Sequence, residues 1–338
     1  MADSQMSGAL DAAEGPCAAG VSRGRARRSW VATALKLGIG IGLLAYLILS
    51  GRLRLAAFRQ LAIGWDVAAA TALIVGALFL PCIRWRLLLH YQGIDVPFTS
   101  AVTMTWIGYV FGLLLPGAVS GDLVRGYYIV KDSPRARARA ASTIIVDRGL
   151  GLYSLFFIGL IPALVLHGRG QMTGLVRGMT LVTLALVVGL TAGLALLWHP
   201  ASRRWSLRLL PSRVGDHIRS ILSDYYSRPV GLGVCFAISL GANLLNVLAF
   251  VPAALALGER LSVVSISLAG PLIILANSLP ISPGGLGVAE STSHALLETF
   301  GFAYGAEVML LLRAVIVASA LPGAVLYATH RGRAKQGE

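Results

Sequence analysis

The stretch "SLPISPGGLGVAES", residues 278–291, decides how the rest of the chain is read. It follows an apolar run, residues 262–277, with the composition of a membrane-crossing helix. Proline and glycine interrupt helices, and such a break survives at membrane depth only where protein buries it or water reaches it. The stretch is therefore either a loop outside the membrane or a broken segment that forms a site within it.

The composition is that of a membrane protein. Hydrophobic residues make up 56% of the 338 residues and charged residues only 13%. We expect an all-α, polytopic transmembrane bundle that forms a single domain over residues 30–328, between a disordered basic leader, residues 1–29, and a basic tail, residues 329–338. The eight hydrophobic segments are residues 30–49, 65–82, 101–115, 143–167, 175–198, 230–257, 262–277 and 306–328.

The net charge of +14 comes mostly from arginines beside apolar segments, where each gains roughly 1 kcal/mol from anionic headgroups. The chain has no nucleic-acid-binding module, so we expect membrane lipids and not nucleic acid as partners. Its cysteines and histidines lack the spacing of metal ligands, and motifs of nucleophilic catalysis are missing. We therefore expect no catalytic residue, metal or cofactor, and an enzyme is not favoured.

The basic residues indicate the topology. If all eight segments crossed from a cytoplasmic N-terminus, the two most basic connections, residues 125–139 and 203–228, would lie outside, against the positive-inside rule. Two re-entrant segments remove this conflict, one turning back to the cytoplasm at residues 114–122 and one turning back to the outer side at residues 278–287. We therefore expect a multi-pass protein of the cell (inner) membrane with both termini in the cytoplasm.

The first break, "LLPGAVSGDLVRGYYIV", residues 114–130, holds the first candidate site residues. Pro116 stops a helix, Gly121 frees backbone before the next one, and Asp122 and Arg125 then share one helical face. The new helix N-terminus suits a phosphate group. The alternative is a capping aspartate with an arginine that faces lipid headgroups.

A charged pair follows in "ASTIIVDRGLGL", residues 141–152. Asp147 and Arg148 lie in an otherwise apolar segment, where a charge costs at least about 2.5 kcal/mol at the membrane centre. We interpret Arg148 as lining a polar cavity, the alternative being an arginine that reaches the cytoplasmic interface as an anchor. The earlier "RWRLLLHY", residues 84–91, is interpreted only as a cytoplasmic helix end.

The second break holds the remaining candidates. Its glycines permit a tight turn and the close approach of a ligand to backbone, and the acid follows within the first turn of the next helix. We expect a binding role for this acid, the alternative being a solvated outer helix. Arg313, deep in the last segment, needs a partner, for which Glu290 and Glu307 are candidates. The candidate site residues here are Pro283, Gly284, Gly285, Gly287 and Glu290.

Both breaks run from Leu-Pro through small residues to glycine and an acid. Paired broken segments in the two halves of a transporter mark its binding site. Chance similarity between two proline- and glycine-rich turns is the competing explanation. If the pair is real, the sequence predicts a transport site between the two breaks.

These three stretches, in this order and spacing, resemble the membrane domain of lysylphosphatidylglycerol synthetases, which also occurs alone in bacterial and archaeal membrane proteins, including hopanoid-associated members. The resemblance covers nearly the whole chain after about residue 30 and implies a domain that passes a modified lipid between leaflets. Asp147 stands where the family often has glutamate. The soluble aminoacyl-transferring domain is missing from this sequence, so lipid aminoacylation is not expected. The family pattern falls on Pro116, Gly121, Asp122, Arg125, Arg148, Pro280, Pro283, Gly284, Gly285, Gly287 and Glu290.

The sequence therefore favours a flippase-like transporter that moves a phospholipid or lipid-linked headgroup between leaflets. In this hypothesis Arg125 and Arg148 hold the lipid phosphate, and Glu290 meets a cationic or hydroxyl-rich headgroup. The alternatives are a secondary transporter of a small anionic solute, and a membrane subunit or enzyme acting on a lipid-linked substrate. A homo-oligomer and a separate lipid-modifying enzyme stay open as partners.

Overall fold

The computed structural model describes residues 38, 41–50, 53, 58, 64–114, 120–134, 136–171, 173–198, 224–225 and 227–328, and within these ranges it is helical without strands. The predicted all-α membrane bundle is thus confirmed. Its elements after residue 64 are α2 (Trp65–Tyr91), α3 (Phe98–Leu114), α4 (Ser120–Asp132), α5 (Arg137–Ile158), α6 (Leu160–Gly168), α7 (Gly174–Trp198), α10 (Pro229–Leu248), α11 (Phe250–Ala256), α12 (Val263–Ser278), the 3₁₀ turn η2 (Pro283–Gly285), α13 (Val288–Glu298) and α14 (Gly305–Ala320).

The apolar helices of the described region fall into two length classes. Long and apolar enough to cross a membrane are Trp65–Tyr91, Arg137–Gly168, Gly174–Leu196, Pro229–Ala256 and Gly305–Ala328. At 1.5 Å per residue, α2 with its 27 residues is about 40 Å long, whereas α3 with 17 and α12 with 16 residues reach only about 25 Å. These two short helices are the segments that the sequence predicts to be broken. Half of the first predicted segment, residues 30–37, 39 and 40, lies outside the described residues.

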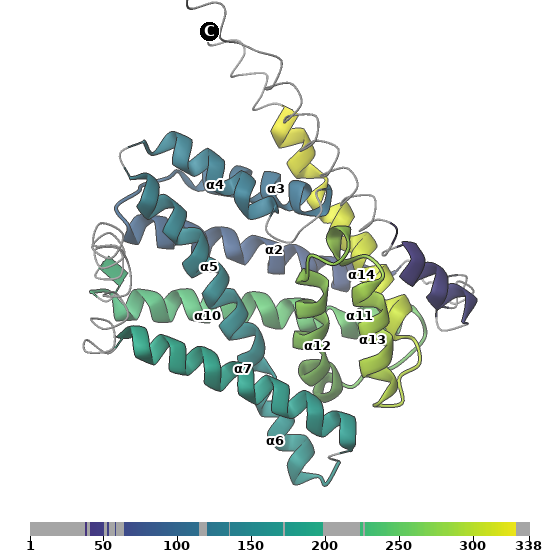
Figure 1. Cartoon of the computed structure of the whole chain (residues 1–338). Coiled ribbons are helices and arrows are strands. Elements are labelled where there is room, and N and C mark those ends of the chain that lie inside the picture. Colours follow the sequence, from purple (N-terminus) through teal and green to yellow (C-terminus); the bar gives the residue numbers. More distant parts are fainter. Residues whose placement is uncertain are drawn as a thin grey trace, which may run out of the picture.

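Helices α2 and α10 lie side by side and antiparallel at the centre of the bundle (Figure 1). Gly231 at the start of α10 lies against the ring of Tyr91 at the end of α2, and Gly76 lies against Leu245 further along. The missing side chains of these glycines permit the close contact. Because the pair is antiparallel, the chain leaves α2 and α11 at opposite ends, so α3 and α12 begin at opposite ends of the bundle.

The first hairpin, α3 with α4, is anchored at the end where α2 stops. Trp85, Ala101, Ile129 and Ala140 pack in one buried cluster, which joins the end of α2 to the start of α3, the end of α4 and the start of α5. Both ends of the hairpin therefore lie at the same end of the bundle.

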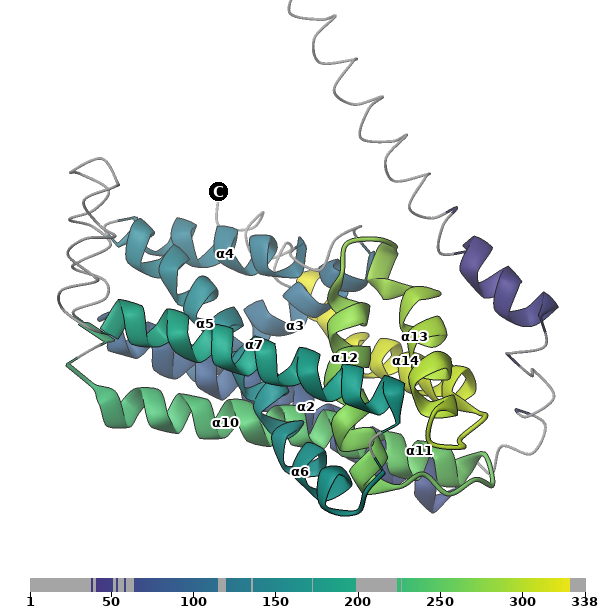
Figure 2. The ribbon, with the colours of Figure 1, turned by 60° about the horizontal axis from the view of Figure 1, so that its bottom comes forward.

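The second hairpin, α12 with α13, is anchored at the other end. Ile74 near the start of α2 shares a buried cluster with Ile266 of α12, Leu297 of α13 and Val308 of α14. Figure 1 and Figure 2 both show the two hairpins on opposite sides of the molecule, with α14 beside the second. The described residues thus contain two helical hairpins, α3–α4 and α12–α13, anchored at opposite ends of the bundle.

The second break packs against the end of α3. A side chain added at Gly284 of η2 would lie 3.7 Å from the carbonyl oxygen of Leu113, near the end of α3. Gly284, Gly285 and Gly287 all have φ between +57° and +80°, the left-handed region that favours glycine. The three predicted glycines therefore form the tight turn that places the second break beside α3.

Candidate functional site

A cavity of about 350 Å³ lies halfway along the long helices. Its lining includes Leu78 of α2, Gly151 of α5 and Asn243 of α10, each within two residues of the midpoint of its apolar helix. Asp122 of the first hairpin and Ser278 of the second also line it. If these helices cross a membrane, the cavity lies at mid-depth and between the two breaks.

Asp147 is the centre of a buried ion network on the cavity wall. Its Oδ1 accepts a hydrogen bond from Arg84 Nε at 2.7 Å, and its Oδ2 accepts one from Arg125 Nη2 at 2.9 Å. All three side chains are less than a tenth exposed. A buried charge needs such pairing because desolvation penalises it, so Asp147 joins α2, α4 and α5.

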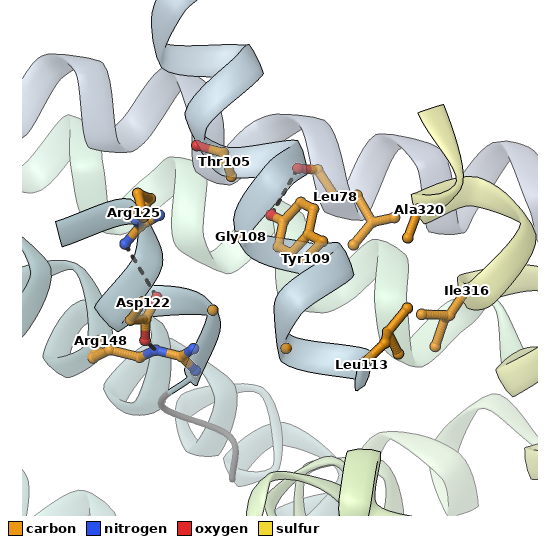
Figure 3. Close-up of a pocket in the computed structure, with 12 residues that line it drawn as sticks. Leu78, Thr105, Gly108, Tyr109, Leu113, Asp122, Arg125, Arg148, Ile316 and Ala320 are labelled. Carbon is orange, nitrogen blue, oxygen red and sulfur yellow. Dashed lines mark hydrogen bonds and ion pairs between the residues drawn. The ribbon is translucent and has the colours of Figure 1, made fainter. Parts of the chain in front are cut away.

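Asp122 extends this network to the open side of the site. Its Oδ1 lies 3.4 Å from Arg125 Nη2, as the predicted i, i+3 pairing requires, and its Oδ2 accepts a hydrogen bond from Arg148 Nε. Figure 3 shows Arg125 and Arg148 approaching Asp122 from opposite sides. The Arg148 side chain is 55% exposed, whereas that of Asp122 is only 11% exposed. Arg148 is therefore the accessible cation of the site.

Neighbouring side chains fix the buried arginines. The Arg125 guanidinium carbon lies 4.4 Å from the centre of the Trp85 ring, whose Nε1 donates to Thr143 Oγ1 at 3.1 Å. Arg84 Nη1 donates to Ser239 Oγ at 2.7 Å, which ties α2 to α10. The Trp85 face and Asp147 hold Arg125, whose Nε is buried without a hydrogen-bond partner among the described residues, and Asp147 and Ser239 hold Arg84.

A second, smaller cavity of about 180 Å³ adjoins the first and shares its charged wall (Figure 3). Its other side is formed by Leu113 of α3 and Ile316 and Ala320 of α14. Gly121 lies between the hairpin arms here, where an added Cβ would stand 2.2 Å from the Gly108 carbonyl oxygen. Gly121 is thus required for close packing of α4 on α3.

The charges that line the large cavity do not balance. Three guanidinium groups against two carboxylates leave one positive charge, because the lining contains no other charged side chain. Both carboxylates are already engaged by arginines. The site is therefore suited to a single added anion at the accessible cation. Within the described residues, no group of three or more His, Cys, Asp or Glu side chains is placed to hold a metal ion.

Glu290 belongs to a different cluster at the second break. Its Oε2 accepts from the backbone amide of Gly287, the N-cap of α13, at 2.7 Å, and its Oε1 accepts from Arg313 Nε at 2.5 Å. Arg313 Nη1 also donates to the Gly284 carbonyl at 2.5 Å, and Nη2 donates to Gly285 at 3.1 Å. Of the two partners foreseen for Arg313, Glu290 is the one that binds it.

The structure thus divides the predicted site residues into two groups. Asp122, Arg125, Asp147 and Arg148 meet at the large cavity. Of the predicted residues of the second break, Gly284, Gly285 and Glu290 bind Arg313, and Glu290 does not line that cavity. Pro116 lies outside the described residues. Substrate binding by either group remains a prediction.

Arg84 is the functional residue that the sequence interpretation missed. "RWRLLLHY" is not merely a cytoplasmic helix end, because Arg84 and Trp85 are buried at the network whereas Arg86 is exposed. Residues two positions apart on a helix point in directions that differ by about 200°, so Arg84 and Arg86 cannot both face the same surroundings. That spacing was the available signal. Asn243 also joins two helices, α10 and α5, since its Nδ2 donates to the Gly151 carbonyl at 2.8 Å.

Comparisons with known proteins agree with this architecture. The family model described as the lysylphosphatidylglycerol synthase TM region matches residues 33–323. A UPF0104 membrane protein of Methanothermobacter thermautotrophicus is 24% identical over 251 residues, which cover 66% of this chain and 72% of that protein. No solved structure matches the chain significantly.

Proposed function

The chain belongs to the lysylphosphatidylglycerol synthase transmembrane family, and from this premise we propose that it moves an anionic phospholipid or lipid-linked headgroup between the leaflets of a cell membrane. The observation that carries the proposal is the cavity with one excess positive charge, halfway along the long helices and between two opposed breaks. Paired broken helices near the bilayer midplane are the usual construction of a transport site.

The basic residues give the proposed orientation. Lys131, Arg137, Arg139 and Arg228 all lie at the end of the bundle where α2 stops, and the Arg228 guanidinium carbon is 5.5 Å from the centre of the Tyr91 ring. Basic connections favour the cytoplasmic side. The first hairpin is then re-entrant from the cytoplasm and the second from the opposite side.

The charge of the cavity explains how a headgroup crosses. A phosphodiester carries one negative charge, so its complex with the site is neutral, and the cost of placing an isolated charge in hydrocarbon is avoided. Arg148 offers planar N–H donors that match phosphate oxygens, while Asp122 and Asp147 keep the other guanidinium groups in place. The apolar tails need no protein path and stay in lipid. Only the headgroup has to pass.

Leaflet exchange in liposomes tests this function. The purified protein is reconstituted with fluorescent phosphatidylglycerol, phosphatidylcholine or polyprenyl phosphate, and exchange is followed by quenching the outer leaflet. We expect Arg148→Gln to slow exchange of the anionic lipids about 10- to 100-fold, the loss of one charge-assisted contact. Arg177→Gln, at an exposed arginine of α7, is the matched control and should leave the rate unchanged.

Two outcomes would contradict the proposal. Absence of exchange for every lipid in the wild-type protein would remove the transport function, and an unchanged rate in Arg148→Gln would remove the site. The same cavity charge would also suit a small soluble anion. Uptake of inorganic phosphate into the same liposomes, without lipid exchange, would indicate that second function.

A further inference from the structure

The two halves of the bundle contain the same pair of charged groups. Asp122 lies in the first turn of α4, directly after the first break, and Glu290 lies in the first turn of α13, directly after the second. Each carboxylate accepts a hydrogen bond from the Nε of an arginine on the next helix, Arg148 of α5 for the first and Arg313 of α14 for the second. The two halves therefore share the carboxylate–arginine pair as well as the break in the helix.

The two halves run in opposite directions. Each half runs from a long helix through a broken hairpin to a helix that carries the arginine, and the hairpins are anchored at opposite ends of the antiparallel α2 and α10 pair. Halves related in this way allow a transporter to present one site alternately to its two sides. In the alternate state the second half then adopts the arrangement that the first half has in this structure, and the first half adopts that of the second.

The two arginines differ in exposure. The Arg148 side chain is 55% exposed and lines the large cavity. The Arg313 side chain is 11% exposed, and its terminal nitrogens donate to the Gly284 and Gly285 carbonyls and to Asn277 Oδ1 at 2.5, 3.1 and 3.2 Å. The first arginine is therefore accessible from the cavity, whereas the second is largely buried against the backbone of the second break.

We propose that the Glu290–Arg313 pair is a second binding site for a lipid phosphate, closed in this structure and presented to the opposite leaflet in the alternate state. This inference rests on the proposed function. Phosphate oxygens would take the place of the Gly284 and Gly285 carbonyls, because a guanidinium group binds a charged phosphate more strongly than neutral carbonyls. Because η2 packs against α3, opening the second hairpin would displace the first.

A neutral pair separates a binding role from a purely structural one. Glu290→Gln/Arg313→Gln removes both charges and keeps amide donors and acceptors, so a merely structural pair would still hold the turn. We expect this variant to elute as a folded protein and to exchange phosphatidylglycerol at least about tenfold more slowly than wild type. Arg313→Lys keeps the charge but loses the planar donors, so it should exchange phosphatidylglycerol more slowly than wild type and faster than the neutral pair. Glu298→Gln, at a 66% exposed acid of the same helix, is the control and should not change it.

Exchange by the folded neutral pair within fivefold of the wild-type rate would overturn the second site, and so would a loss in Arg313→Lys as large as that in the neutral pair. If the neutral pair does not fold, folded Arg313→Lys decides: slower exchange of phosphatidylglycerol than in wild type supports the site, and an unchanged rate overturns it. In each case wild-type exchange still establishes the transport function. Failure of the second site is thus distinguishable from failure of the function.

Discussion

Replacing Asp147 by asparagine is expected to destabilise the protein strongly. The substitution leaves Arg84 and Arg125 buried without the carboxylate that now binds both, at 2.7 and 2.9 Å. Removing one partner of a buried ion pair costs about 3–5 kcal/mol. At about 2 °C per kcal/mol for a chain of this size, the melting temperature should fall by roughly 6–10 °C. The excess charge of the cavity also rises from one to two.

Thermal unfolding in detergent, followed by the loss of the monodisperse elution peak, measures this effect. Asp95→Asn is the matched control, because Asp95 pairs with His90 at 2.7 Å but is 84% exposed. An exposed pair contributes only about 0–1 kcal/mol, so the control should shift by less than about 2 °C. Added phosphatidylglycerol should stabilise Asp147→Asn more than wild type, since it neutralises the extra charge. Equal shifts in the two variants would refute the assignment of Asp147 as the centre of the network.

Three further predictions follow from packing. Gly121→Ala should prevent the first hairpin from closing, because the new Cβ would stand 2.2 Å from a backbone carbonyl oxygen. Gly149→Ala has open space around its new Cβ and should be tolerated. The yield of folded protein compares the two variants. Gly285→Ala should lower the melting temperature more than Gly301→Ala, since both have positive φ but only Gly285 also meets neighbouring backbone within 3 Å. Arg84→Gln should reduce both the melting temperature and lipid exchange, measured as above, because it removes a partner of the buried aspartate.

Much of the fold follows from the sequence because hydropathy and helix breakers act locally. The apolar run at residues 262–277 and the break after it correspond to α12 and η2. The boundaries of the helices were harder to predict from the sequence. Hydropathy ends the second segment near residue 82, but α2 continues to Tyr91 because Arg84 is paired inside the bundle and does not mark the surface.

The ion pairs of the candidate site could be predicted from the sequence only where both partners are close together in the chain. Asp122 and Arg125 are three residues apart, so their pairing follows from helix geometry. Arg84 and Asp147 are 63 positions apart, and no local rule connects them. Their contact depends on how α2 and α5 pack, which a single sequence does not specify. The same reason explains why Glu290 and Glu307 were equal candidates for Arg313.

The most direct test of the account is an experimental structure of the protein in a lipid nanodisc that contains phosphatidylglycerol. We predict a lipid phosphate in the cavity beside the Arg148 guanidinium, level with the midpoint of α2, with its acyl chains outside the helices. A cavity that contains only water while every phosphate stays in the two headgroup layers, including in protein trapped during exchange, would contradict it.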